Sequence, residues 1–212
     1  MSFDLLAPHY CWMEFILAGE KLQRCRTAFL DRIASHKNIL VLGEGNGRFL
    51  SELLFANRTA RITCVDSSAK MLCCAATRLA HQNISTNRIE FTHRDILDWT
   101  LPNQQFDAIV SHFFLDCFTS NQLESIISRI ATATRPEGIW LISDFHEPSR
   151  GFAKWRARAI LWLMYRFFRS ITKIPARYLI APDAPLQRNG FQLRERKFAE
   201  WDLLHSDLWQ RA

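Results

Sequence analysis

Residues 39–49 read Ile-Leu-Val-Leu-Gly-Glu-Gly-Asn-Gly-Arg-Phe, and this stretch decides the fold. A short apolar run over residues 38–43 enters a cluster holding three of the chain's seven glycines, and a helical apolar period restarts at Phe49. The pattern predicts a buried strand, a tight turn and a helix. Glycine lets the backbone of such a turn approach a ligand closely, with the helix N-terminus behind it.

Apolar runs and helical periods continue to alternate beyond this loop. The predicted strands are residues 38–43, 61–66, 89–95, 106–112, 138–144, 191–198 and 203–209. The predicted helical segments are 4–35, 49–54, 67–82, 121–134 and 150–173. This order predicts one α/β domain with a doubly wound, mostly parallel seven-stranded sheet of Rossmann-like type, closed by an antiparallel C-terminal hairpin.

Two carboxylates follow the loop at the ends of the next two strands. Asp66 stands 19 residues past Gly47, where an acid can accept both hydroxyls of a ribose. An alternative role for Asp66 is to cap the following helix, which Ser67 or Ser68 could do as well. Asp95 closes the third predicted strand, where it can accept from an adenine amine. A glycine loop and two such acids on three successive strands predict a nucleotide-type ligand.

Composition excludes several classes of protein. Hydrophobic residues make up 48% of the 212 residues and charged residues 23%, which is typical of a folded globular domain. The longest apolar run, residues 159–165, is far shorter than the roughly 20 residues of a bilayer span. The N-terminus, MSFDLLAPHY, lacks the features of a signal peptide. The six cysteines show no C-x-x-C spacing, so we expect reduced thiols in a cytoplasmic protein.

Positive charge is concentrated in the last third of the chain. Residues 148–212 carry 13 basic side chains against five acidic ones, and residues 148–182 hold eight basic residues and no acid. Aromatic residues are interleaved with these cations, so the segment predicts a basic amphipathic helix. Three roles stay open: a lid helix with its basic face in water, peripheral contact with an anionic membrane through residues 150–173, or nucleic-acid binding by stacking.

The sequence resembles the class I S-adenosylmethionine-dependent methyltransferases, and most of all the small-molecule branch that includes the ubiquinone/menaquinone methyltransferases. The segments that carry the resemblance are ILVLGEGNGRF, ITCVDSSAKML, IEFTHRDIL, FDAIVSHFFLDCF and LQRNGFQL. The resemblance implies one methyltransferase domain with four parts. These are cofactor-covering helices (1–36), a cofactor-binding core (37–147), a basic aromatic lid insert (148–182) and the C-terminal hairpin (183–212).

The resemblance also assigns the cofactor site, which would hold S-adenosyl-L-methionine. The residues implied are Gly43, Glu44, Gly45 and Gly47 for the methionine part, Asp66 for the ribose, Ser67 and Met71 flanking the adenine, Asp95 and Ile96 at its edge, His112 beside the sulfonium, and Tyr10 over the methyl group. A core aromatic is the alternative for Tyr10. The loop departs from the family pattern, because the acid stands at Glu44 and Phe49 replaces the last glycine. The alternative is that the backbone carbonyls of Gly43 and Gly45, and not Glu44, contact the methionine amine of the cofactor.

Catalytic candidates lie after the fourth and fifth predicted strands, because open α/β sheets bind ligands at the carboxyl ends of their strands. We predict His146 and then His112 as proton acceptors, since imidazole titrates near neutral pH. Asp116, Asp144 and Glu147 are the other candidates. Asp144, His146 and Glu147 could also be metal ligands. A divalent-metal site of that kind needs acids from the ends of more than one strand, and the sequence offers no matching second group, so we predict no metal.

The predicted function is methyl transfer to a small hydrophobic or aromatic acceptor. A nicotinamide dehydrogenase would keep G-x-G-x-x-G, and here the last place is Arg48. A nucleic-acid methyltransferase using residues 150–177 is the closer alternative. The stretch Ser111-His-Phe-Phe-Leu argues against it, because base-amine methylating relatives carry Asn/Asp-Pro-Pro-Tyr/Phe there. A non-catalytic cofactor-binding homologue is a third class, and the oligomeric state stays open.

Overall fold

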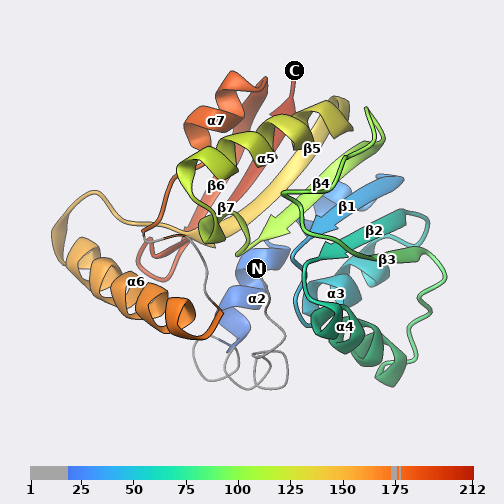
Figure 1. Cartoon of the computed structure of the whole chain (residues 1–212), viewed down its shortest axis with the longest axis horizontal. Helices are drawn as coiled ribbons and strands as arrows, with labels where there is room; N and C mark the ends of the chain where they lie inside the picture. The colour runs from blue at the N-terminus through green and yellow to red at the C-terminus, as the bar shows by residue number, and fades with distance from the viewer. Residues whose placement is uncertain (1–18, 173–175, 177) are drawn as a thin grey trace.

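The computed structural model describes residues 19–172, 176 and 178–212 of the chain. Its centre is one seven-stranded sheet in the order β3-β2-β1-β4-β5-β7-β6 (Figure 1). The strands are β1 (Asn38–Leu42), β2 (Arg61–Asp66), β3 (Ile89–His93), β4 (Phe106–His112), β5 (Thr134–Phe145), β6 (Phe191–Ala199) and β7 (Leu204–Arg211). Strands β1 to β5 are parallel, and β7 runs antiparallel to both β5 and β6. The predicted doubly wound, mostly parallel sheet is therefore confirmed.

Helices cover both faces of the sheet. They are α2 (Gly19–Thr27), α3 (Arg48–Ala56), α4 (Ala69–His81), α5 (Ser120–Ala133), α6 (Gly151–Thr172) and α7 (Asp183–Arg188), with 3-10 turns η1 (Leu30–Ile33) and η2 (Leu115–Cys117). Helices α3 and α4 lie on one face and α5 and α7 on the other (Figure 1). Helix α6 stands to one side of the sheet (Figure 1). Within the described residues, no helix is long and apolar enough to cross a membrane.

Strand β1 shows why the apolar run near the start of the core is continuous. Leu40 and Leu42 pack into the core cluster under α5, while Ile39 and Val41 pack into the opposite cluster under α3 and α4. All four side chains are buried. A strand covered on both faces needs apolar residues at every position, which is the pattern of a central parallel strand.

Two expected boundaries differ from the structure by more than two residues. The predicted helical segment 4–35 is, in its described part, α2 followed by η1, because Phe29 leaves helical geometry (φ −128°, ψ 24°) and is buried in the core with Ile33. Strand β5 begins at Thr134 rather than residue 138. Thr134 pairs with Phe106 across an irregularity in the β4–β5 register, and this extends the strand backwards through Pro136. Periodicity does not detect an extension of that kind.

Candidate functional site

One pocket opens beside the carboxyl ends of β1, β2 and β4 and the segment after β3. Its lining residues are Leu42, Gly43, Gly45, Val65, Asp66, Ser67, Met71, Arg94, Asp95, Ile96, Phe113, Phe114, Cys117 and Phe118. Seven of the residues predicted to hold the cofactor are among them: Gly43, Gly45, Asp66, Ser67, Met71, Asp95 and Ile96. The topology brings these three separate segments together because β1, β2 and β3 are neighbours in the parallel sheet.

The glycines of the loop after β1 have distinct roles. Gly43 (φ +64°) lines the pocket, and a Cβ atom there would lie 2.3 Å from Cδ2 of Phe114. Gly47 (φ +82°) precedes α3, and a Cβ atom there would lie 2.8 Å from the Cα atom of Ala75 in α4. Gly47 is not one of the described pocket-lining residues. Gly43 thus permits the close pocket wall, whereas Gly47 permits close packing of α3 on α4.

Glu44 occupies a different position from the one that the resemblance implies. Its Oε1 accepts hydrogen bonds from the backbone amides of Phe49 (2.9 Å) and Leu50 (3.1 Å), in the first turn of α3. A carboxylate there satisfies amide groups that have no partner inside the helix and interacts favourably with the helix dipole. Among the described residues that line the pocket, Glu44 is absent. The structure thus gives Glu44 a capping role for α3.

Asp66 and Ser68 divide the two roles that the sequence leaves open. Ser68 is the N-cap of α4, and its hydroxyl accepts from the amide of Met71 at 3.2 Å. Asp66 ends β2, lines the pocket and accepts from the amide of Ser68 at 2.8 Å through Oδ1. That hydrogen bond fixes the orientation of a carboxylate that is only 8% exposed. Asp66 is therefore held in place at the pocket while Ser68 caps the helix.

Asp95 follows β3 on the other side of the pocket. Its Oδ1 accepts from the amide of Leu97 at 3.0 Å, which fixes the turn that carries it. Ile96, the next residue, is buried in the core cluster under α5. The guanidinium of Arg129 on α5 donates to the carbonyls of Ile96 and Leu97, both at 2.6 Å. The segment that presents Asp95 is thus anchored to a helix.

An aromatic wall closes the pocket on the β4 side, and sequence reasoning did not assign it. The wall consists of Phe113, Phe114 and Phe118, with Cys117 between them. Phe113 adopts a left-handed conformation (φ 52°), which is rare for a bulky side chain and turns the chain sharply after β4. The amide of Phe113 donates to the carbonyl of Ser143 at 2.7 Å. The aromatic content of the segment FDAIVSHFFLDCF is the signal that could have identified this wall.

His112 is buried one residue before this wall. Its ring packs edge-on against Phe49 with the centroids 4.6 Å apart. Burial, and then the positive charge of Arg26, lowers the pKa of His112 well below its ordinary value. His112 is not one of the described residues that line the pocket, whereas the next two residues, Phe113 and Phe114, do line it. The structure therefore places the imidazole of His112 inside the core beside the pocket, where burial favours its neutral form.

Asp116 and Asp144 form a buried pair of carboxyl groups behind the aromatic wall. The amide of Asp116 donates to Oδ2 of Asp144 at 3.2 Å, and the thiol of Cys117 contacts Oδ1 of Asp116 at 3.5 Å. Burial raises the pKa of Asp116 to about 6, and burial with repulsion from Asp116 raises the pKa of Asp144 well above its ordinary value. Since like charges disfavour double ionisation, the pair retains a proton near neutral pH. Cys117 connects this pair to the pocket.

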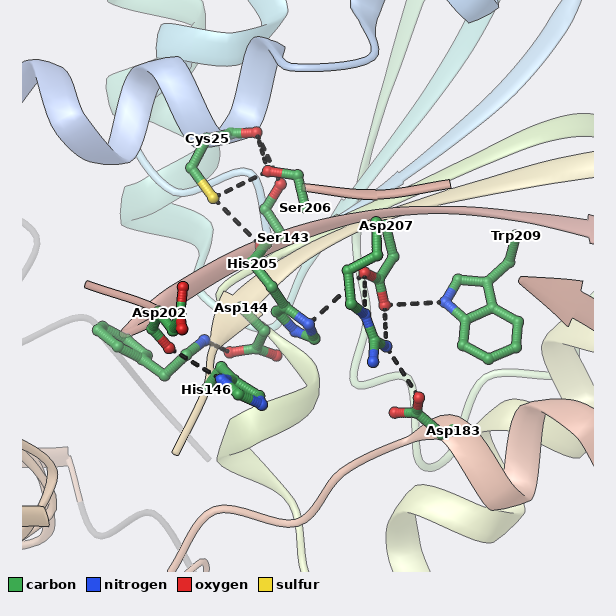
Figure 2. A network of polar contacts seen from close by, with 12 residues as sticks. Cys25, Ser143, Asp144, His146, Asp183, Asp202, His205, Ser206, Asp207 and Trp209 are labelled. Carbon is green, nitrogen blue, oxygen red and sulfur yellow. Dashed lines mark hydrogen bonds and ion pairs between the residues drawn. The ribbon is translucent and has the colours of Figure 1, made fainter. Parts of the chain in front are cut away.

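His146, the first catalytic prediction, follows β5 in a polar network (Figure 2). Its Nδ1 contacts the carbonyl of Asp202 at 2.8 Å, and its ring lies 5.9 Å from that of His205 between centroids. Arg196 joins Asp207 (2.6 Å) to Asp183 (2.8 Å) in the same network. His146 is not one of the described pocket-lining residues. The contact with Asp202 ties His146 to the β6–β7 turn.

Two further predictions concern Tyr10 and a metal. Tyr10 lies outside the described residues, so its place over the cofactor stays a prediction. No group of three His, Cys, Asp or Glu side chains within the described residues is arranged to hold a metal ion.

Comparisons with known proteins agree with this geometry. Residues 39–138 match the family model described as a methyltransferase domain. An uncharacterized methyltransferase of Anoxybacillus flavithermus is 30% identical over 106 residues, covering 50% of this chain and 46% of that protein. The chain thus spans about half the length of this curated relative. Mitomycin 7-O-methyltransferase MmcR has a similar fold (TM-score 0.71, 16% identity), which covers 100% of this chain and 61% of that one. N-methyltransferase NodS from Bradyrhizobium japonicum, solved with S-adenosyl-L-homocysteine, gives a TM-score of 0.62 at 16% identity over 91% and 84% of the chains.

The sheet order defines a Rossmann-like fold, which the solved methyltransferase structures share. Residues 39–138 of this chain resemble a methyltransferase domain, for which the sequence predicts S-adenosyl-L-methionine as the cofactor. The residues present fit that cofactor, because two carboxylates, a glycine loop without side chains and an aromatic wall surround one pocket. The two carboxylates suit a ribose and an adenine, the glycine loop suits the methionine part, and the aromatic wall suits an apolar sulfonium neighbourhood.

Proposed function

We propose that this protein transfers the methyl group of S-adenosyl-L-methionine to a small hydrophobic or aromatic acceptor. The single observation that carries the proposal is the convergence of Gly43, Asp66 and Asp95 on one pocket with an aromatic wall. The free thiols of the five described cysteines, Cys25, Cys64, Cys73, Cys74 and Cys117, support a cytoplasmic location.

The cofactor supplies an activated methyl group on its sulfonium sulfur, together with its own leaving group. The chain contributes binding, orientation and exclusion of water. Asp66 accepts from the ribose hydroxyls and Asp95 from the adenine amine. Phe113, Phe114 and Phe118 keep water away from the methyl group and present an apolar surface to the acceptor. This surface favours a ring-bearing or otherwise apolar acceptor over a sugar or an amino acid.

The acceptor side adjoins Cys117 and the carboxyl pair behind it. We infer that the pair Asp116–Asp144, rather than His112, takes up the proton that an acceptor hydroxyl or amine loses. The pKa of about 6 for Asp116 is close to the value at which a base works best near neutral pH. His112 is buried against Phe49. The pH–rate profile of methyl transfer tests the prediction for His146 as well, because replacing the base at the acceptor changes that profile and replacing a residue outside the acceptor site does not.

The relatives support both oxygen and nitrogen as acceptor atoms. One solved structure of similar fold is a mitomycin 7-O-methyltransferase and another is an N-methyltransferase. The branch that includes the ubiquinone/menaquinone methyltransferases stays part of the proposal, and quinols and phenols are the first acceptors to examine.

Isothermal titration calorimetry with S-adenosyl-L-methionine and S-adenosyl-L-homocysteine tests the cofactor part of the proposal. We expect micromolar dissociation constants for the wild type and at least tenfold weaker binding for Asp66→Ala, because the ribose hydroxyls lose a fixed acceptor. Glu52→Ala is the matched control, since Glu52 is an exposed acid on α3 and its removal changes the charge equally. Absence of binding at millimolar ligand would contradict the proposal.

Methyl transfer itself is measured with radiolabelled cofactor and a panel of quinols, phenols, amines and a structured RNA. We expect turnover with an apolar ring compound. Transfer to RNA alone would overturn the acceptor class. Cofactor binding without turnover on any of these acceptors would favour the non-catalytic homologue.

A further inference from the structure

Helix α6 has one face that holds it to the protein. Ala157, Leu161 and Tyr165 are buried together with Leu203, which precedes β7. The hydroxyl of Tyr165 donates to the carbonyl of Asp116 at 3.1 Å. These three residues recur every four positions and so follow one side of the helix. The orientation of α6 on the protein is therefore fixed by this inner face.

The opposite face of α6 is apolar and exposed. Its side chains and their exposed fractions are Phe152 (76%), Trp155 (71%), Trp162 (65%), Leu163 (63%) and Phe167 (38%). At 100° per residue they fall within an arc of about 140°, centred opposite the inner face. The helix stands beside the sheet (Figure 1), and the side chains of this outer face are exposed whereas those of the inner face are buried. A contiguous exposed apolar stripe of this kind marks an interaction surface.

The charges along α6 are of one sign. Its sequence from Gly151 to Thr172 contains no Asp or Glu. The guanidinium of Arg166 lies 5.7 Å from the ring centre of Trp162, and that of Arg158 lies 6.0 Å from the ring centre of Trp155. Arg158 follows one edge of the outer face, and it also pairs with Glu147 at 3.4 Å. Cations bordering exposed tryptophans complement a surface that is negatively charged at its rim and apolar below it.

We propose that the outer face of α6 docks into the interface of an anionic lipid bilayer, with the helix lying parallel to the membrane plane. Phe152, Leu163 and Phe167 would enter the acyl boundary, while Trp155 and Trp162 would lie at the level of the headgroups. The cations would contact lipid phosphates, each adding to the attraction at low salt. This inference goes beyond methyl transfer, because docking requires neither cofactor nor acceptor.

The observations favour lipid over nucleic acid as the partner. A nucleic-acid surface places cations where phosphates run and aromatic rings where bases stack. On α6 the centre of the outer face consists of phenylalanine and leucine side chains, and leucine has no ring on which a base can stack. The face is also the convex side of a single helix rather than a groove. An apolar stripe bordered by cations matches a bilayer better.

Co-sedimentation of the full chain with vesicles tests this inference. The vesicles are phosphatidylcholine alone and a 3:1 mixture of phosphatidylcholine with phosphatidylglycerol, each at 0.05 M and 0.5 M NaCl. We expect binding to the mixed vesicles at low salt, and at least tenfold weaker binding to neutral vesicles or at high salt. Equal binding to both kinds of vesicle, or none to either, would overturn the proposal.

Matched variants separate the outer face from the rest of the surface. Trp155→Ser combined with Trp162→Ser is expected to weaken vesicle binding at least tenfold, and Arg158→Gln combined with Arg166→Gln to remove most of the preference for anionic lipid. Phe55→Ser is the control, because Phe55 on α3 is 65% exposed and lies apart from α6. Thermal melts should stay within about 2 °C of the wild type, since exposed side chains contribute little to stability. Unchanged vesicle binding in the tryptophan variant would contradict the proposal.

Two other ligands of this face, RNA and a second copy of the chain, are tested in parallel. Mobility shift with single-stranded RNA and analytical ultracentrifugation of the free protein are run on the wild type and on the tryptophan variant. RNA binding or dimer formation that depends on Trp155 and Trp162, without vesicle binding, would overturn the lipid assignment. Because vesicle binding is measured without cofactor, its outcome is independent of the test of methyl transfer.

Discussion

At the scale of single residues, the two loop glycines Gly43 and Gly47 provide a contrast between binding and folding. Gly43→Ala would place a Cβ atom against the ring of Phe114, and the ring would be pushed into the pocket. We expect this variant to bind S-adenosyl-L-homocysteine at least tenfold more weakly by calorimetry, with a loss of stability of about 1 kcal/mol from the left-handed backbone.

Gly47→Ala should have the reverse effect. Its Cβ atom would meet the backbone of Ala75 in α4, which cannot yield as a side chain does. We expect a loss of about 2–4 kcal/mol in urea denaturation, because α3 and α4 must separate. Binding per folded molecule should change much less than in Gly43→Ala. A Gly47→Ala protein of normal stability would contradict the packing role.

The carboxyl of Asp116 predicts a dependence of stability on pH. Burial raises the pKa of this acid from 3.8 to about 6 in the folded protein, so the unfolded chain releases the proton first as pH rises. The group therefore lowers the free energy of unfolding increasingly between about pH 4 and pH 6, and the full loss, on the order of 3 kcal/mol, is present above pH 6.

Asp116→Asn removes that loss. We expect urea denaturation to show a variant more stable than the wild type at pH 8, with little difference at pH 4. Exposed Asp98→Asn is the control and should leave the pH profile unchanged. If Asp116 also accepts a proton during methyl transfer, the stabilised variant will lose activity, and the acidic limb of the pH–rate profile will shift. Equal stability changes at both pH values would contradict the burial argument.

At the scale of elements, Glu44 and α3 form the clearest structural unit of the loop. Glu44→Ala removes the acceptor for two amides of the first helical turn. We expect a loss of about 1 kcal/mol in urea denaturation, as for other N-terminal caps. The affinity for S-adenosyl-L-homocysteine should change less than threefold. A tenfold loss of affinity at unchanged stability would instead make Glu44 a ligand of the cofactor.

The elements also show what the sequence can and cannot predict. Strands β1, β2 and β4 are predicted well, because burial on both faces demands continuous apolar runs of the observed length. The break between α2 and η1 is not predicted. It arises because Phe29 and Ile33 pack into a core formed by segments far away in sequence. Local periodicity carries no information about such contacts.

The site shows the same division. Gly43, Asp66 and Asp95 are predicted from the sequence because each lies at the end of a strand or within two residues of it, and the parallel topology brings these strand ends to one edge of the sheet. The sequence does not predict Phe113 and Phe114, because the wall depends on a left-handed backbone turn at Phe113. Bulky residues such as phenylalanine rarely adopt that conformation, so the residue type gives no sign of it. The pairing of Asp116 with Asp144 joins η2 to β5 through a backbone amide. The spacing of residues along the sequence carries no information about tertiary contacts of this kind.

At the scale of the whole molecule, the pocket couples ligand binding to global stability. It is lined by residues from β1 and β2, the start of α4, and the segments that follow β3 and β4, so a ligand that fills it binds the folded chain and not the unfolded one. At a concentration 100 times its dissociation constant, such a ligand adds about 2.7 kcal/mol to the free energy of unfolding. For a chain of this size, that corresponds to a rise in melting temperature of roughly 5–10 °C.

S-adenosyl-L-homocysteine is therefore expected to raise the melting temperature by this amount in differential scanning fluorimetry, and NADH to leave it unchanged. The two ligands share an adenosine moiety, but NADH requires room for a pyrophosphate on the glycine loop, where Phe114 lies directly against Gly43. Asp66→Ala should lose most of the shift, and Glu52→Ala should keep it. A rise with NADH and none with S-adenosyl-L-homocysteine would assign the pocket to a dinucleotide and contradict methyl transfer. A rise with S-adenosyl-L-homocysteine alone, lost in Asp66→Ala, would show that cofactor binding at Asp66 stabilises the entire sheet.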